Sequence, residues 1–276
     1  MPLATLTDVL QPALRGGYAV AGLVVLGWED ARAYVAAAEA ERAAVILQAG
    51  PGCRAHTPLP VLAAMFRHLG AAASVPVVAH LDHGYSADDC REAIDCGFTS
   101  VMFDGSKLPL AQNIARTAAI ARMAHDAGVS IEGEIGVVGY AGGAASSATD
   151  AREAARFAAE TGVDAVAVSV GNVHLQQTAQ AEVDWNALRA IESATDLPLV
   201  LHGSSGIPAA DRARLARESR VCKFNVGTEL RQVFGAALRD TLARHPAEFD
   251  RLKLLSATEP PLTEAARKVI RTLGKG

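Results

Sequence analysis

The sequence has little of several features that would direct it to particular classes of protein. Only 5% of its 276 residues are aromatic, and its formal net charge is −4. Without a basic surface to neutralise phosphates, no nucleic-acid partner is expected. No apolar stretch approaches the ~20 residues that span a bilayer, so no membrane partner is expected either. Half of the residues are hydrophobic, and the core must therefore be largely aliphatic.

Cysteine is also scarce. The four cysteines (Cys53, Cys90, Cys96 and Cys222) lack the paired spacing of a structural metal site. In a chain of this length we interpret them as reduced thiols. The N-terminal segment MPLATLTDVLQPALRGG lacks the basic start and unbroken apolar run of a signal peptide. Together these features predict a cytoplasmic protein.

Eight short, β-branched apolar runs alternate with longer helix-like segments. The runs begin at Tyr18, Ala43, Pro76, Thr99, Val129, Asp164, Pro198 and Val221. Continuous apolar runs are typical of strands buried on both faces, and alternating β and α units predict a parallel sheet. Eight such units close a barrel. We therefore predict one α/β domain over residues 1–276, a (β/α)8 TIM barrel with an N-terminal capping helix and an extra C-terminal helix.

Polar side chains gather where the predicted strands end. In a TIM barrel the carboxyl ends of the strands meet at one mouth, where active sites lie. The residues brought there are Asp82, His83, Asp104, Ser106, Glu132, Glu134, His174, His202, Gly203, Ser204, Ser205, Asn225, Gly227 and Thr228. Each alone is more often a structural residue. Three histidines and several carboxylates at one mouth indicate a catalytic site.

Three of these side chains, His83, His174 and His202, are the predicted metal ligands. Three imidazoles with an open fourth position form a catalytic zinc site, in which the metal polarises a substrate oxygen. Glu134 is predicted as an extra or alternate ligand. His80 lies on the same strand as His83, and we expect it to support the site without binding the metal.

Asp82 is the predicted proton-transfer residue. Neighbouring residues of a regular strand point to opposite faces, so Asp82 and His83 both reach the mouth only if the strand has already ended there, as Gly84 suggests. A carboxylate close to a metal-bound carbonyl can exchange a proton with a substrate hydroxyl. Two alternatives stay open: Asp82 caps the following helix, or it orients a ligand histidine.

The segments after the last two predicted strands are typical of phosphate sites. HGSSGIP precedes a predicted helix near Pro208, and NVGTE precedes one from Glu229. Backbone N–H groups at helix N-termini bind phosphate together with Ser or Thr hydroxyls. Phosphate sites after strands seven and eight recur in this fold. Gly227, in the second segment, is one of the candidates.

The sequence resembles the class II ketose-bisphosphate aldolases, which include fructose-bisphosphate and tagatose-bisphosphate aldolases. The matching segments, in family order, are AHLDHG, MFDGSKLPLAQN, IEGEIG, SVGNVH, LVLHGSSGIP and KFNVGTEL. The resemblance implies a zinc-dependent aldehyde-lyase that cleaves or forms a ketose phosphate. Dihydroxyacetone phosphate would be the ketone fragment, formed through a metal-stabilised enediolate.

The resemblance also implies roles for individual residues. Asp82 would exchange the proton of the substrate's C4 hydroxyl. The phosphate would be held by Gly203, Ser205, Asn225 and Thr228. A monovalent cation such as Na⁺ or K⁺ is also common beside the phosphate in this family, and a homodimer or homotetramer is expected.

The chain departs from the family's pattern in several places. The loop from Val137 to about Thr149, which we interpret as a lid, lacks the family's carboxylate; Tyr140 or a metal-bound water could replace it. Leu175 stands where the family has Gly, and the Asn that ends the family's first strand is missing. A divergent member is therefore predicted.

The residues that bind a second phosphate are not evident. Arg267, Lys268 and Arg271 are candidates, although a solvated basic face is the favoured interpretation. Two other functions stay open. One is another metal-dependent barrel enzyme acting on a sugar phosphate, an isomerase or a hydrolase. The other is a non-catalytic sugar-phosphate binder.

Overall fold

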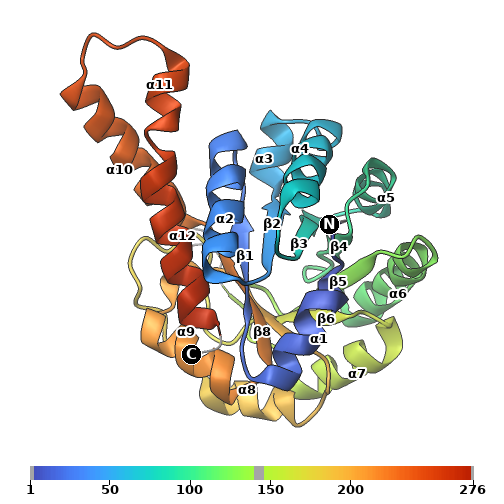
Figure 1. Ribbon diagram of the computed structural model, residues 1–276. Helices are drawn as coiled ribbons and strands as arrows, with labels where there is room; N and C mark the ends of the chain where they lie inside the picture. The colour runs from blue at the N-terminus through green and yellow to red at the C-terminus, as the bar shows by residue number, and fades with distance from the viewer. Residues whose placement is uncertain (1–2, 140–145, 275–276) are drawn as a thin grey trace.

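Eight parallel strands close into a barrel in sequence order (Figure 1), in a computed structural model that describes residues 3–139 and 146–274. The strands are β1 (Val20–Val24), β2 (Val45–Ala49), β3 (Val77–Gly84), β4 (Ser100–Phe103), β5 (Ser130–Ile135), β6 (Ala165–Val168), β7 (Leu199–Leu201) and β8 (Val221–Val226). Each strand lies in one of the predicted apolar runs. The predicted single-domain (β/α)8 barrel is confirmed.

Helices cover the outside of the barrel. They are α2 (Trp28–Glu41), α3 (Pro51–His56), α4 (Leu59–Ala72), α5 (Ala87–Cys96), α6 (Leu110–Asp126), α7 (Ala151–Thr161), α8 (Trp185–Glu192), α9 (Ala209–Glu218) and α10 (Thr228–Arg244). Their inner faces pack on the outward-pointing strand residues, such as Leu23, Leu47 and Leu81, in one large apolar cluster. Full burial of a Leu or Val side chain stabilises the fold by roughly 1.5–3 kcal/mol.

Helix α1 (Leu6–Gly16) covers the N-terminal mouth of the barrel. It begins with a capping box: the Asp8 backbone N–H donates to the Thr5 hydroxyl, and the Thr5 N–H donates to the Asp8 carboxylate. Its buried face packs on the lower layer of the barrel interior. The residues of this contact are Leu6, Val9, Leu10, Ala13, Val20, Ile46, Val78, Met102, Ala165, Ala167, Val200 and Cys222. The lower barrel is thus filled with apolar side chains, and polar groups lie above them.

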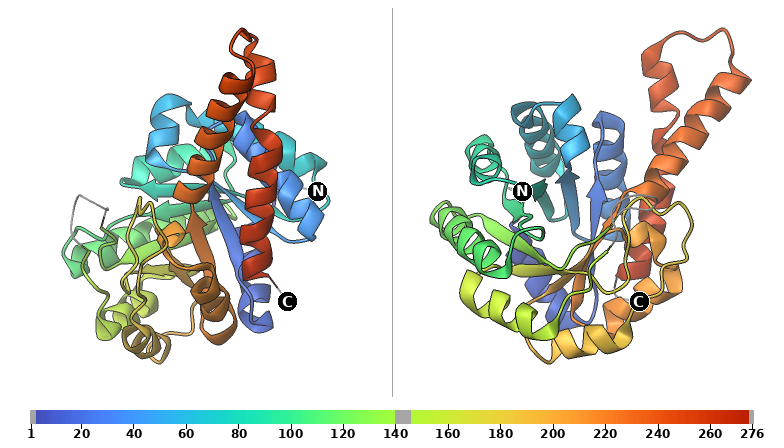
Figure 2. Two further views of the ribbon diagram at one scale, coloured as in Figure 1. Left: turned by 90° about the vertical axis from the view of Figure 1, so that its left-hand side faces the viewer. Right: turned by 180° about the vertical axis from the view of Figure 1, so that it is seen from behind.

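The predicted C-terminal helix is α12 (Glu259–Leu273), which packs against α2, α9 and α10. The helix α11 (Arg251–Ser256) precedes it and was not predicted. The outer part of α10 and α11, here called the arm (residues 240–256), stands away from the barrel (Figures 1 and 2).

No helix in the described parts of the chain is long and apolar enough to cross a membrane. The four cysteines are free. Burial raises the pKa of the Cys53 thiol to about 11 and those of Cys90 and Cys222 to about 12, so these thiols are protonated at neutral pH.

Candidate active site

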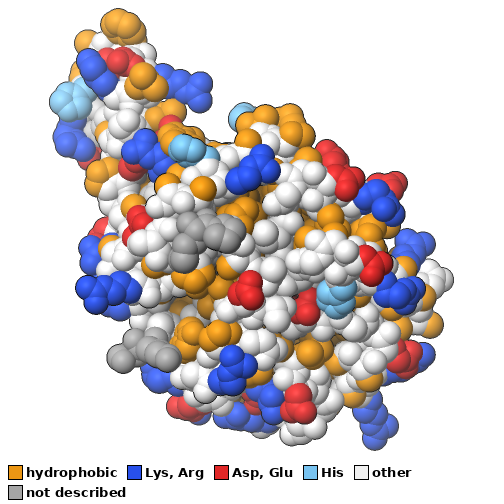
Figure 3. Space-filling model, turned by 45° about the vertical axis from the view of Figure 1, so that its right-hand side comes forward, with side chains coloured by type: hydrophobic (Ala, Val, Ile, Leu, Met, Phe, Trp, Pro, Cys, Tyr) orange, Lys and Arg blue, Asp and Glu red, His pale blue; other side chains and the backbone are white. Residues whose placement is uncertain are grey.

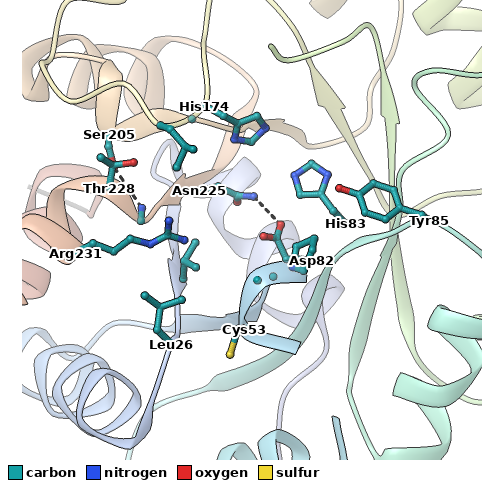
Figure 4. Close-up of a pocket in the computed structure, with 17 residues that line it drawn as sticks. Leu26, Cys53, Asp82, His83, Tyr85, His174, Ser205, Asn225, Thr228 and Arg231 are labelled. Carbon is teal, nitrogen blue, oxygen red and sulfur yellow. Dashed lines mark hydrogen bonds between the residues drawn. The ribbon is translucent and has the colours of Figure 1, made fainter. Parts of the chain in front are cut away.

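A cavity of about 270 Å³ opens at the carboxyl ends of the strands (Figure 4). The predicted site residues that line it are Asp82, His83, His174, Gly203, Ser205, Asn225, Gly227 and Thr228. The two remaining predicted residues, His202 and Glu134, are buried close to His83. The structure thus brings residues from five separate strand ends to one mouth.

The strand β3 is irregular where it carries Asp82 and His83. Its pairing with β4 shifts register between Leu81 and Gly84, and His83 has a left-handed backbone with φ 52°. The expected reason for both side chains reaching the mouth was therefore wrong. The strand continues to Gly84, and a local backbone distortion turns the two neighbouring residues to the same cavity.

Arg54 of α3 braces this distorted backbone. Its Nη1 donates to the carbonyls of Ala49 and Asp82, each at 2.6 Å, and its Nη2 donates to the carbonyl of His83 at 3.0 Å. The planar guanidinium has several donors in fixed directions and can hold three carbonyls at once. Sequence reasoning missed Arg54 because nothing in its local pattern points to a contact 28 residues away.

The three predicted metal ligands converge. The ring centroids of His83 and His202 are 4.7 Å apart, those of His83 and His174 are 5.3 Å apart, and those of His174 and His202 are 5.7 Å apart. One nitrogen of each ring lies within 4.8 Å of the others. The rings come from β3, from the segment after β6 and from the end of β7.

Hydrogen bonds fix the tautomers of two of these rings. His83 donates from Nδ1 to the Asp104 carboxylate at 2.9 Å, and His202 donates from Nε2 to Glu132 Oε1 at 2.9 Å. Each carboxylate is an acceptor only, so in neutral rings the lone pairs are on His83 Nε2 and His202 Nδ1. These two nitrogens face each other at 3.0 Å. Two facing lone pairs repel unless a proton or a metal ion lies between them.

The pKa values show which ring carries a proton when no metal is bound. Burial opposes the charged form of His83, but Asp82, Asp104 and Glu134 outweigh it and raise its pKa to about 9. Burial, reinforced by the charge of His83, lowers the pKa of His174 to about 4 and that of His202 well below its ordinary value. The centre therefore holds one positive charge on His83, which a divalent ion would replace.

Glu134 lies on the other side of His83. Its Oε2 is 3.7 Å from His83 Nδ1 and has no hydrogen-bond partner among the described residues. Burial raises the pKa of this carboxyl to about 8. Together with His83 and Asp104 it forms a second group of metal-type side chains. Glu134 is thus placed beside the three imidazoles, next to the ring of His83.

Asp82 is buried at the cavity wall, and Asn225 Nδ2 donates to its Oδ1 at 3.3 Å (Figure 4). It does not cap the following helix. That role belongs to Ser86, whose hydroxyl accepts from the Asp89 N–H at the start of α5. Asp82 keeps one oxygen toward Asn225, and the other lies close to Gly50, where a side chain would crowd it.

The two predicted phosphate segments meet at the start of α10. Ser205 Oγ accepts the N–H groups of Gly227 and Glu229, each at 3.3 Å. Gly203 has φ 62°, and a Cβ there would lie 2.3 Å from the Val173 carbonyl oxygen, so the position requires glycine. The N-terminus of a 17-residue helix therefore faces the cavity with a hydroxyl beside it, which is suited to an anion.

Other residues of the cavity were not predicted. Arg231, one turn into α10, reaches the cavity beside Thr228, and Tyr85 and Leu26 add to its walls (Figure 4). The predicted basic candidates lie elsewhere: Arg267 and Arg271 pair with Glu41 of α2. Lys268 also lies away from this cavity, between α9, α10 and α12.

The predicted lid is described only at its ends. Val137 and Ser147 form an antiparallel bridge, and the Gly139 carbonyl accepts the backbone N–H of His174 at 2.8 Å. Tyr140 lies outside the described residues. The described base of the loop therefore supports His174, a predicted ligand, directly. Leu175, next to it, has φ 56°, a conformation that suits the glycine expected there.

The chain is similar over its whole length to known aldolases. The family model described as "Fructose-bisphosphate aldolase class-II" matches residues 4–276. The chain belongs to this class II aldolase family. The "Probable fructose-bisphosphate aldolase" of Bacillus subtilis (strain 168) is 36% identical over 99% of this chain and 98% of the relative. The "6-phospho-5-dehydro-2-deoxy-D-gluconate aldolase" of Shouchella clausii (strain KSM-K16) is 34% identical over 99% of this chain and 95% of its own length.

A solved structure is also similar to this class II aldolase. The crystal structure of the YdjI aldolase from Escherichia coli K12 matches with a TM-score of 0.88 and 30% identity, covering 99% of this chain and 97% of the other. The resemblance found in the sequence motifs is confirmed. The protein is an aldehyde-lyase, and its barrel holds the metal-type side chains that such chemistry uses.

Proposed function

We propose that this aldolase is zinc-dependent and cleaves or forms a ketose phosphate, with dihydroxyacetone phosphate as the ketone fragment. The observation that carries the proposal is the convergence of His83, His174 and His202, with His83 Nε2 and His202 Nδ1 facing each other at 3.0 Å. Three imidazole donors suit zinc, for which nitrogen–metal distances are about 2.0–2.1 Å. The buried, unpartnered Glu134 oxygen lies close by, on the other side of His83, and remains our candidate for an extra or alternate ligand.

When bound, zinc would supply Lewis acidity toward a substrate oxygen and stabilise the negative charge that develops on the ketone fragment. Asp82 is our candidate for the proton step: it takes the proton of the C4 hydroxyl during cleavage and returns it during condensation. Asn225 holds Asp82 Oδ1 and so fixes the direction of the carboxylate.

The phosphate is proposed to bind at Gly203, Ser205, Asn225, Gly227 and Thr228. The partial positive charge at the N-terminus of α10 favours an anion there. Arg231 adds a full positive charge to the same cavity. Apolar residues such as Val24 and Leu26 also line the cavity, and Val24 lies next to Gly227.

The test is a screen of ketose monophosphates and bisphosphates with zinc present, following release of dihydroxyacetone phosphate with a coupled dehydrogenase. We expect release that is lost with a chelator and restored by zinc. Borohydride added with substrate should not trap the enzyme, because no lysine Schiff base is involved. Covalent capture, or full turnover in the chelated protein, would contradict the proposal.

We also propose that two or more copies assemble through the arm. Phe249 is 91% exposed, Leu252 75% and Leu242 41%. Figure 3 shows hydrophobic side chains at the end of this projection. An apolar groove at its base, lined by Trp28 and Val61 among others, offers a complementary surface on the same chain. Replacing Phe249 and Leu252 with Ser should lower the mass seen by light scattering; an unchanged mass refutes this contact.

A further inference from the structure

A buried ion pair lies inside the barrel below the proposed metal centre. Lys223 of β8 is fully buried, and its Nζ lies 2.6 Å from Glu132 Oε2 and 3.2 Å from His80 Nε2. Removing an ammonium and a carboxylate from water costs several kcal/mol each, and apolar residues of similar volume are often as stable. Stability alone therefore does not explain why this lysine is present.

The ammonium of Lys223 sets which groups donate and which accept in the hydrogen bonds around this pair. A lysine ammonium only donates, so Lys223 forces His80 Nε2 to accept, and His80 Nδ1–H faces the Ser100 hydroxyl at 2.8 Å. Lys223 also occupies Glu132 Oε2, which leaves Glu132 Oε1 for His202 Nε2–H at 2.9 Å. All five side chains are fully buried. Water therefore does not compete for these positions.

We propose that Lys223 is a positioning residue of the metal centre, which orients Glu132 and thereby holds His202 in the one tautomer that presents Nδ1 to the metal. The inference rests on the proposed metal-binding role of His202. Glu132 accepts from both sides, so the ammonium on one side and the imidazole N–H on the other determine each other's orientation. Partners that orient a ligand histidine typically change metal affinity 10–100-fold.

The replacement Glu132→Gln tests this logic, because an amide has one donating and one accepting end. With Lys223 in place, the amide oxygen of the new side chain must face the ammonium. Its NH₂ group then faces His202 Nε2, and the ring changes tautomer, with its Nδ1–H pointing toward the metal position. We expect zinc affinity to fall at least 100-fold, as the wrong tautomer removes a ligand lone pair.

The double variant Glu132→Gln/Lys223→Met gives the decisive comparison. Without the ammonium, the amide can turn over and accept from His202 Nε2–H again. We expect the double variant to bind zinc at least tenfold more tightly than Glu132→Gln alone, although it lacks one more native side chain. If Lys223 were only structural, the double variant should bind zinc more weakly than Glu132→Gln, because the loss of a second native side chain would add to the loss of the first.

The measurements are zinc dissociation constants from competition with a chromogenic chelator and ¹⁵N chemical shifts of the imidazoles in the metal-free protein. The matched control is Lys268→Met on α12, which removes a lysine away from the site and should bind zinc like the parent. If Glu132→Gln does not fold, the neutral double variant replaces it, with affinity expected within tenfold of the parent.

Each outcome has a separate meaning. A double variant that binds zinc no better than Glu132→Gln, or an unchanged His202 tautomer in Glu132→Gln, overturns the role of Lys223. Where the single variant fails to fold, a double variant more than tenfold weaker than the parent overturns it. A parent protein that binds no zinc overturns the proposed metal centre itself. The two proposals can therefore fail independently.

Discussion

Replacing Gly203 with Ala should damage the catalytic centre through the backbone alone. A Cβ at this position would lie 2.3 Å from the Val173 carbonyl oxygen and 2.9 Å from the His174 backbone nitrogen. Both atoms belong to the main chain that carries a proposed ligand. Ordinary contacts of this kind are above about 3 Å, so the two segments must move apart by nearly 1 Å.

The magnitude follows from two separate costs. The left-handed conformation of Gly203, φ 62°, costs an L-residue roughly 1–2 kcal/mol. A displacement of ~1 Å at a catalytic group can lower the rate about 100-fold. Gly162 separates these effects, because it has φ 73° at the end of α7 and nothing within 4 Å of its added Cβ. Gly162→Ala therefore carries the conformational cost without the collision.

Both variants should be compared by thermal unfolding, zinc affinity and turnover. Gly162→Ala is expected to lower the Tm by roughly 2–8 °C, taking about 2–4 °C per kcal/mol, with zinc affinity and kcat unchanged. Gly203→Ala is expected to lower the Tm further, weaken zinc binding and reduce kcat about 100-fold. Equal zinc affinity and equal kcat in the two variants would refute the argument that Gly203 keeps His174 in place.

Four further predictions concern the same mouth. Asp82→Asn should keep zinc bound but reduce kcat by about 10²–10⁴-fold; undiminished turnover would remove Asp82 from the proton step. Because the pKa of His83 is raised to about 9, zinc must displace its proton, so affinity should rise about tenfold per pH unit up to about pH 9 and then level off. Because the folded-state pKa of His83 is raised, protonation of His83 also stabilises the metal-free fold. This contribution is complete below pH 6.5, the ordinary pKa of the group, and is lost as the pH rises through about 9. Titration calorimetry across pH checks the zinc affinity, and melting curves across pH check the stability. Arg54→Met removes three hydrogen bonds to carbonyls, each worth roughly 1.5–3 kcal/mol, and should lower both the Tm and zinc affinity; an unchanged Tm would show that the distorted strand needs no brace.

The repeating pattern of apolar runs was enough to predict the eight strands. Each strand is buried on both faces and is therefore apolar along its length, and each has two parallel strands of the same kind beside it. The mouth was also predictable, since His83, His174 and His202 follow separate runs and the fold itself brings strand ends together. These inferences depend only on the spacing of the apolar runs and on their order along the chain. They do not need the register of any strand pair.

The interior partners could not be predicted in the same way. Lys223 and Glu132 are 91 residues apart, and their contact depends on register, including the shift in the pairing of β7 with β8. A lysine within an otherwise apolar run was a visible signal of a buried charge, but it did not name the partner. The left-handed backbone at His83 likewise lies at the β3–β4 irregularity and is braced by Arg54, and no local preference encodes either contact.

The apolar plug formed by α1 and the lower barrel has a kinetic consequence. Because apolar side chains close the lower end of the barrel, reactants and both products must pass through the mouth at the carboxyl ends of the strands. A compound that blocks this mouth would inhibit both cleavage and condensation without contacting the imidazoles.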